Sequence, residues 1–202
     1  MKYDISCRIY GMFYHNACKK ILGEKGVGKE EIHSIQKEYQ AVVERASSIG
    51  KSKLLSAYLM AAYFIAMNRC DGLSSEENYE VLNEGLKTSK IFKAVLGNAD
   101  SYLDPKKLQG RIQWSRETHE KKYENEWVVD IIEGDGTFDL GYDYHACGVC
   151  ALCRDEGCPE YAKYLCRLDY MMAELMGMEL ERTTTIAEGG TFCDFRYRKK
   201  SK

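Results

Sequence analysis

The strongest indication of a β-sheet in this sequence comes from residues 127–145, Trp127-Val-Val-Asp-Ile-Ile-Glu-Gly-Asp-Gly-Thr-Phe-Asp-Leu-Gly-Tyr-Asp-Tyr-His145. Its first part, up to Glu133, is rich in β-branched residues, and Gly134-Asp-Gly136 is a typical turn sequence. After the turn, apolar and polar residues alternate as far as His145, which is the period of a strand with one buried face. The stretch therefore predicts an antiparallel β-hairpin.

A second hairpin is expected near the end of the chain, separated from the first by a helix. Residues 159–178 carry apolar side chains at three- and four-residue intervals, as an amphipathic helix does, and Gly177 or Met178 ends it. Residues 180–187 and 192–198 are predicted strands, because Gly189-Gly190 between them suits a tight turn. The order ββαββ predicts an antiparallel sheet with one helix packed on it.

The sequence before residue 126 predicts helices. Residues 28–47 show the apolar stripe of an amphipathic helix, and residues 54–69 are apolar nearly all round, which is typical of a central helix. Ser74 precedes acidic residues in the manner of an N-cap and predicts a helix to about Lys87. A further helix is predicted to open at Asp104-Pro105.

The fold class that these elements predict is α+β. A chain of 202 residues is long enough for one sizeable core. We therefore expect the helical region, 1–125, and the α+β region, 126–202, to form one compact unit.

Composition argues against several classes of partner. The net charge is -2, with Lys and Arg dispersed among Asp and Glu, so no basic face is expected for nucleic acid. The most apolar stretch, residues 54–67, is shorter than the roughly twenty residues that cross a bilayer, and residues 1–11 lack a signal-peptide core. We expect a cytoplasmic protein whose partner is a small molecule. The sequence does not indicate its oligomeric state.

The chain has nine cysteines, and this odd number favours reduced thiols over a disulfide framework. Four of them form a C-x2-C-x2-C-x4-C-P motif, namely Cys147, Cys150, Cys153 and Cys158. Four thiolates at this spacing would suit zinc or an iron–sulfur cluster. Because the last gap is one residue longer than in the bacterial ferredoxin motif, we favour a loop without a bound metal or other cofactor, and keep either metal centre as the alternative.

Two pairs of residues are candidates for catalysis. His145 stands two residues before Cys147, and an imidazole beside a thiol is the usual means of generating a thiolate at neutral pH. The alternative is that His145 is a half-exposed residue without such a role. Cys166 and Asp169 are three residues apart on the predicted helix and share a face, where Asp169 is either structural or a general base toward water.

The last hairpin supplies candidates for substrate binding. Alternation in the final strand places Cys193 on one face and Asp194 and Arg196 on the other. Cys193 is either a small buried apolar residue or part of a pocket wall, and Asp194 with Arg196 is either a surface ion pair or part of a site. Arg182 or Arg196 would bind a carboxylate in bidentate fashion.

Four ordered segments together resemble the L-2-amino-thiazoline-4-carboxylic acid hydrolase family. They are Gly141-Tyr-Asp-Tyr-His-Ala-Cys147, Tyr164-Leu-Cys-Arg-Leu-Asp-Tyr170, Arg182-Thr-Thr-Thr-Ile-Ala-Glu-Gly-Gly190 and Cys193-Asp-Phe-Arg196. The resemblance spans about residues 127–198. It implies hydrolytic opening of a small sulfur heterocycle, L-2-amino-thiazoline-4-carboxylate, to N-carbamoyl-L-cysteine. The family pattern falls on Cys147, Cys166, Asp169, Arg182, Gly189, Cys193, Asp194 and Arg196, and Tyr144 of the first segment joins them as a substrate-binding candidate.

Two functions from different classes remain open. The first is a hydrolase acting on a cyclic amidine, with Cys147 as nucleophile and His145 or Asp169 as base. The second is a non-catalytic module that binds or senses a small molecule, to which a distant similarity to the 4-vinyl reductase type of binding domain points. Turnover of the thiazoline separates the two.

Overall fold

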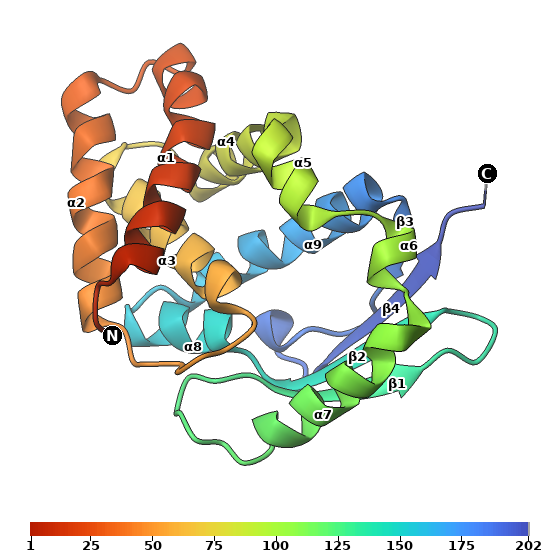
Figure 1. Cartoon of the computed structure of the whole chain (residues 1–202). Helices are drawn as coiled ribbons and strands as arrows, with labels where there is room; N and C mark the ends of the chain where they lie inside the picture. The colour runs from red at the N-terminus through yellow and green to blue at the C-terminus, as the bar shows by residue number, and fades with distance from the viewer. Residues whose placement is uncertain (202) are drawn as a thin grey trace.

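The computed structural model describes residues 1–201 and has the predicted α+β class, with a helical first half and a four-stranded antiparallel sheet in the second (Figure 1). The helices of the first half are α1 (Ile5–Glu24), α2 (Lys29–Arg45), α3 (Leu55–Cys70), α4 (Ser75–Thr88), α5 (Lys90–Leu96), α6 (Ala99–Tyr102) and α7 (Leu108–Thr118), with the 3-10 helix η1 (Pro105–Lys107) before α7. The second half contains β1 (Val128–Glu133), β2 (Leu140–Ala146), α8 (Gly148–Asp155), η2 (Pro159–Tyr161), α9 (Ala162–Met176), β3 (Met178–Glu181), η3 (Ile186–Glu188) and β4 (Cys193–Lys199).

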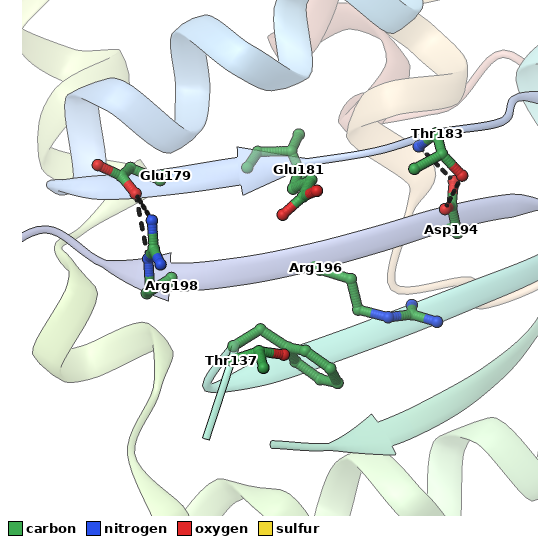
Figure 2. Close-up of a pocket in the computed structure, with 9 residues that line it drawn as sticks. Thr137, Glu179, Glu181, Thr183, Asp194, Arg196 and Arg198 are labelled. Atoms are coloured by element: carbon green, nitrogen blue, oxygen red, sulfur yellow. Dashed lines mark hydrogen bonds and ion pairs between the residues drawn. The ribbon is translucent and has the colours of Figure 1, made fainter. Parts of the chain in front are cut away.

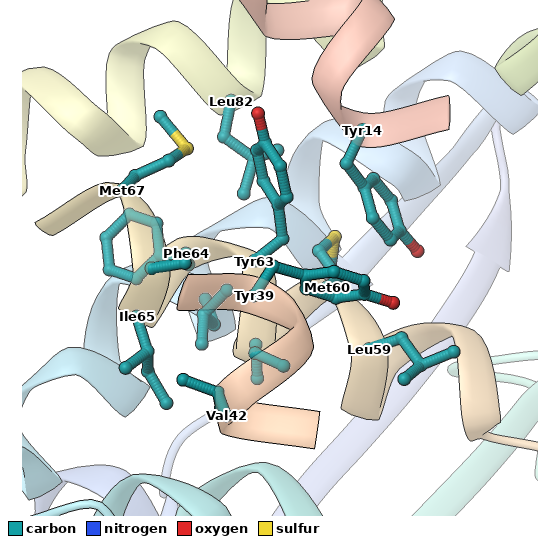
Figure 3. Packing of buried hydrophobic residues seen from close by; sticks show 14 of the residues in the cluster. Tyr14, Tyr39, Val42, Leu59, Met60, Tyr63, Phe64, Ile65, Met67 and Leu82 are labelled. Atoms are coloured by element: carbon teal, nitrogen blue, oxygen red, sulfur yellow. The ribbon is translucent and has the colours of Figure 1, made fainter. Parts of the chain in front are cut away.

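Helix α3 lies at the centre of the helical half, as its apolar sequence predicts. Every residue from Tyr58 to Met67 is buried, because α1, α2, α4 and α8 all contact this helix. Figure 3 shows the resulting core, in which Tyr14 of α1 and Tyr39 of α2 lie beside Tyr63 of α3. No helix within residues 1–201 combines the length and apolarity that crossing a membrane would need.

Local sequence signals set the ends of the helices. The predicted start of α4 is confirmed as a capping box, in which the Ser74 hydroxyl accepts from the Glu77 backbone N–H and the Glu77 carboxylate accepts from the Ser74 backbone N–H. Helix α9 ends at Gly177, which has a φ of 78°, a left-handed conformation that glycine adopts without strain.

The sheet has the strand order β1-β2-β4-β3, and each neighbouring pair is antiparallel. Tyr144 of β2 is opposite Cys193 of β4, and both belong to the inner face, which packs against α9 and the α6–α7 segment. Gly141 is opposite Arg196, and an added Cβ at Gly141 would lie 3.1 Å from the Arg196 Cδ and Nη1 atoms. Glycine at this position therefore leaves room for the arginine to cross the outer face.

Two predicted details are wrong. The segment that holds Cys147 to Cys158 is not a loop, because residues 148–155 form α8 with Cys147 at its N-cap. Strand β3 ends at Glu181, short of the predicted Ala187, because the Asp194 carboxylate accepts from the Thr183 and Thr184 backbone N–H groups and turns the chain into η3.

Side chains from both halves meet in one buried cluster that contains most of α3 together with residues of α8 and α9. At its edge, the Glu156 carboxylate is bonded by Arg45 of α2 at 2.9 Å and by Arg69 of α3 at 2.7 Å. This arrangement fixes α8, and the cysteine at its N-terminus, against the helical half.

Candidate active site

Six of the predicted site residues face the inner side of the sheet, where α8, α9 and the end of β3 converge. They are Tyr144 from β2, Cys147 from the N-cap of α8, Cys166 and Asp169 from α9, Arg182 from just after β3, and Cys193 from β4. The Asp169 charge acts on the Tyr144 hydroxyl and on the thiols of Cys147, Cys166 and Cys193. The structure thus brings these residues together around one carboxyl group.

The Asp169 carboxylate and the Arg182 guanidinium form the ionic centre of this cluster. Arg182 donates from Nη1 to Asp169 Oδ2 over 2.9 Å, and from Nη2 to the Cys166 carbonyl over 3.0 Å. The Arg182 side chain is only 4 % exposed, whereas Asp169 remains 25 % exposed and so accessible to a ligand. Burial raises the pKa of Asp169 to about 6 even though Arg182 opposes this rise.

Aromatic rings hold the Arg182 guanidinium in place. Its central carbon lies 4.8 Å from the centroid of the Phe195 ring and 5.0 Å from that of the Tyr170 ring. Such contacts stabilise a cation that has lost water. The Arg182 Nε is buried without a hydrogen-bond partner, so the fixed position depends on the two Nη groups and the rings.

Cys147 has the setting of a reactive thiol. A hydrogen bond from the Cys150 thiol and the backbone N–H groups of Cys150 and Val149 together lower the pKa of Cys147, against burial and the nearby Asp169 charge. Its place at the N-terminus of α8 adds the positive end of the helix dipole, which also favours a thiolate.

The other two thiols of the cluster lack that setting. Burial, followed by the charge of Asp169, raises the pKa of Cys166. Burial raises the pKa of Cys193 to about 11, and its sulfur accepts from the Ile186 backbone N–H at 3.2 Å. Cys147 is therefore the thiol of the cluster best suited to act as a nucleophile.

A hollow of about 300 Å³ opens onto this cluster. It reaches the cluster at Cys166 and Arg182, and Tyr170 forms part of its wall. The rest of its lining is polar or charged and comprises Glu76, Lys163, Tyr164, Arg167 and Glu188. A small polar molecule that enters here meets the residues that contact Asp169.

The structure does not bring His145 to Cys147. His145 lies on the exposed outer face of β2, where its Nε2 is 2.9 Å from Asp130 Oδ2 and its ring stacks on Phe192. His119 contacts the other oxygen of Asp130 at 2.8 Å. Burial raises the pKa of Asp130, but the two histidine contacts outweigh it and the pKa is lowered. Strand alternation turns His145 away because Tyr144 occupies the inner face.

Asp194 and Arg196 also lie on the outer face, away from Asp169. Arg196 donates to the Asp143 carboxylate at 2.7 Å, and its guanidinium lies 5.2 Å from the Phe138 ring centroid. Asp194 does not pair with Arg196, because it accepts from Thr183 and Thr184 instead. These bonds fix the chain next to Arg182, so Asp194 positions the inner-face arginine from the other side of the sheet.

The outer face has a hollow of its own, of about 380 Å³, which Figure 2 shows between β3, β4 and the β1–β2 turn. Its charged side chains include Glu179, paired with Arg198, as well as Glu181, Asp194 and Arg196. No cysteine among the described residues lines this hollow, so the cluster of thiols lies on the inner face instead.

The four cysteines of the C-x2-C-x2-C-x4-C motif interact as two pairs. The Cys147 and Cys150 thiols shift each other's pKa, and so do the Cys153 and Cys158 thiols. Within residues 1–201, no group of three or more His, Cys, Asp or Glu side chains is arranged to hold a metal ion.

Sequence reasoning missed three contributors to the inner-face cluster, namely Cys150, Tyr170 and Phe195. Tyr170 and Phe195 lie in the motif segments, next to Asp169 and between Asp194 and Arg196. The helical spacing of Tyr170 and the strand alternation of Phe195 predict only ordinary packing. Nothing in the sequence indicated that both rings contact Arg182. The three-residue spacing of Cys147 and Cys150 would have indicated that their side chains meet if a helix beginning between them had been predicted.

Comparison with known proteins agrees with the motif segments. No curated protein and no solved structure matches the chain significantly. A family model described as L-2-amino-thiazoline-4-carboxylic acid hydrolase matches residues 52–197, which include α3 to α9, the whole inner-face cluster and most of β4. On this match, the chain belongs to the L-2-amino-thiazoline-4-carboxylic acid hydrolase family.

Proposed function

We propose that this protein hydrolyses a small cyclic amidine that contains sulfur, such as L-2-amino-thiazoline-4-carboxylate, to N-carbamoyl-L-cysteine. The observation that carries the proposal is a partly exposed carboxyl group with a pKa of about 6, Asp169, in the same cluster as Cys147, a thiol whose pKa is lowered. A catalytic acid or base is most effective when its pKa lies near the working pH.

The proposed reaction begins with attack of the Cys147 thiolate on the ring carbon between nitrogen and sulfur. The bond from that carbon to the ring sulfur then breaks, and protonated Asp169 delivers its proton to the leaving sulfur. The substrate is now held on Cys147 as an open-chain isothiourea.

Water completes the reaction. Asp169, now ionised, accepts a proton from water as the water oxygen attacks the same carbon. The bond to Cys147 breaks, the urea carbonyl forms, and one water molecule has been consumed. The product carries a free thiol that the substrate lacks.

The charges around the hollow suit a substrate that bears a carboxylate. Arg182, Lys163 and Arg167 all line it. Arg167 is bonded to Glu76 at 2.7 Å, so its charge is largely compensated. We assign Arg182 to hold Asp169 and to supply the positive charge nearest the reacting groups, which is the setting that a carboxylate prefers.

Free-thiol release from the thiazoline by the full-length protein tests the proposal. Cys147→Ala and Asp169→Asn should each reduce the rate by at least about 100-fold, the lower range for loss of a catalytic group. Cys70→Ser, on α3 and outside the cluster, is the matched control and should keep the wild-type rate. Binding of the thiazoline without turnover in the wild type would reject the hydrolase and favour a binding module.

A further inference from the structure

The first two cysteines of the motif have the arrangement of a redox dithiol. Cys147 is the N-cap of α8, with φ -126° and ψ 116°, and its carbonyl accepts the first helical hydrogen bond, from Ala151, at 3.0 Å. Cys150 is the third residue of that helix. Side chains at the N-cap and at the third helical position face each other, as they do in a capping box.

The backbone geometry allows a disulfide between them. Two residues three apart at the start of an α-helix have Cα atoms about 5 Å apart, within the range that a disulfide bond spans. Each thiol also shifts the pKa of the other, as neighbouring thiols do. Both residues are partly exposed, unlike Cys153 and Cys158.

The neighbouring thiols are less suited to this exchange. Cys153, one turn further along α8, is 0 % exposed, and Cys158, whose backbone N–H donates to the Cys153 carbonyl at 2.8 Å, is itself buried. Cys166 lies on a different helix and has Asp169 beside it. Cys147 and Cys150 therefore combine partial exposure with a spacing that a disulfide bond can span.

The two thiols are also unequal in the way that exchange requires. Hydrogen bonding from Cys150 and from backbone N–H groups lowers the pKa of Cys147, and the shared hydrogen bond with burial raises the pKa of Cys150. Cys147 is then the attacking thiolate, and Cys150 stays protonated until a mixed disulfide forms.

We propose that Cys147 and Cys150 form a thiol–disulfide exchange site that reacts with low-molecular-weight disulfides. The disulfide formed between the two residues reversibly removes the Cys147 thiolate from the active site. The Cys147 thiolate attacks one sulfur of the small disulfide, a mixed disulfide forms, and one small thiolate leaves. Cys150 then attacks the Cys147 sulfur and releases the second small thiolate, which takes up the Cys150 proton. Two protein thiols are oxidised to one disulfide while the small disulfide is reduced to two thiols.

The regulatory part of this inference rests on the proposed function, because the disulfide removes the thiolate assigned to attack the thiazoline. Hydrolysis should stop when the pair is oxidised and return when a dithiol reductant restores it. The exchange itself is independent of hydrolysis, since it needs only the two thiols and the start of α8.

Peptide mass analysis of the full-length protein in glutathione redox buffers tests the exchange without reference to turnover. After quenching with iodoacetamide, the wild type in excess glutathione disulfide should lose both alkylation masses on the 147–150 peptide and carry one internal disulfide. Cys150→Ser should instead accumulate one glutathione on Cys147. Cys147→Ser should show neither product, and Cys70→Ser should match the wild type. Circular dichroism confirms that each variant is folded.

Two results would overturn the exchange site. One is a folded Cys150→Ser variant whose Cys147 stays fully alkylated in the oxidising buffer, and the other is a wild-type disulfide that joins different cysteines. If the fully reduced protein does not open the thiazoline, while oxidation still joins residues 147 and 150, the proposed function is rejected and the exchange site stands.

Discussion

Arg182 and Asp169 join the end of β3 to α9 through a 2.9 Å hydrogen-bonded ion pair, and the cation is almost wholly buried. The pair holds a carboxyl group among the thiols of the inner face, where burial keeps its pKa near 6. Loss of either partner leaves the other in an apolar setting, and the first predictions follow from that dependence.

Arg182→Ala should destabilise the fold by roughly 3 kcal/mol, because it leaves Asp169 without its cation and a space between the Tyr170 and Phe195 rings. Urea unfolding measures this loss. The matched control is Arg198→Ala, which removes an exposed pair with Glu179 and should leave the midpoint essentially unchanged. Equal midpoints for the two variants would show that the buried pair does not hold the site together.

The contribution of Asp169 to stability should fall as the pH rises from about 4 to about 6. The folded state keeps a proton on Asp169 in this window, because burial raises its pKa to about 6 from an ordinary value of 3.8, whereas the unfolded chain releases it. The proton on Asp169 makes its full contribution to the free energy of unfolding below pH 4. The contribution disappears as the pH rises past 6, and it amounts to no more than about 3 kcal/mol. Relative to the wild type, Asp169→Asn should therefore gain stability across the window. A constant difference between the two proteins would argue against the raised pKa.

Gly148→Ala should disturb both stability and the reactivity of Cys147. A Cβ at this position would lie 2.6 Å from the Asn125 carbonyl oxygen and 2.6 Å from Cζ3 of Trp127, so the start of α8 has to shift. Gly110→Ala in α7 is the control, because nothing lies within 4 Å of its Cβ and it should stabilise the helix by roughly 0.5 to 1 kcal/mol. Thermal melts and the alkylation rate of Cys147 measure the two effects. Wild-type values for Gly148→Ala would show that the close contacts relax without cost.

His145→Ala should retain thiazoline hydrolysis within about twofold, because the imidazole bonds to Asp130 on the outer face and the proposed base is Asp169. Steady-state rates of this variant and of Asp169→Asn make the comparison. A loss in His145→Ala as large as that in Asp169→Asn would reinstate the histidine as the base.

Much of the architecture was predictable because short-range patterns determine it. The alternation of apolar and polar residues in β4 predicted which side chains lie on its buried face. The apolar composition of α3 predicted its central position. The N-cap at the start of α4 was predicted as well, and the structure adds that it is a capping box. Helices α1 and α5 had no individual prediction, and each exposes apolar residues, Ile5 on α1 and Val95 on α5, that blur the amphipathic pattern.

The sequence motifs named residues that the structure brings close together, but they did not predict how those residues are arranged. The motif segments contained Cys147, Asp169 and Arg182, yet the pairing of Asp169 with Arg182 depends on how β3 meets α9. Proximity along the chain favoured His145 as the partner of Cys147, and strand alternation placed it on the opposite face. Helix α8 was not predicted because four cysteines in a short segment suggested a loop, either free of metal or with a metal centre as the alternative.

Thiazoline hydrolysis is tested most directly by following the chemical conversion of the ring carbon that lies between nitrogen and sulfur. The full-length protein is incubated with L-2-amino-thiazoline-4-carboxylate labelled with ¹³C at that carbon, and the carbon is followed by NMR. We expect the wild type and Cys70→Ser to convert it to the carbamoyl carbon of N-carbamoyl-L-cysteine, and we expect a loss of at least about 100-fold in Cys147→Ala and Asp169→Asn. An unchanged ring carbon with the wild type, or wild-type conversion by Cys147→Ala and Asp169→Asn, would contradict it.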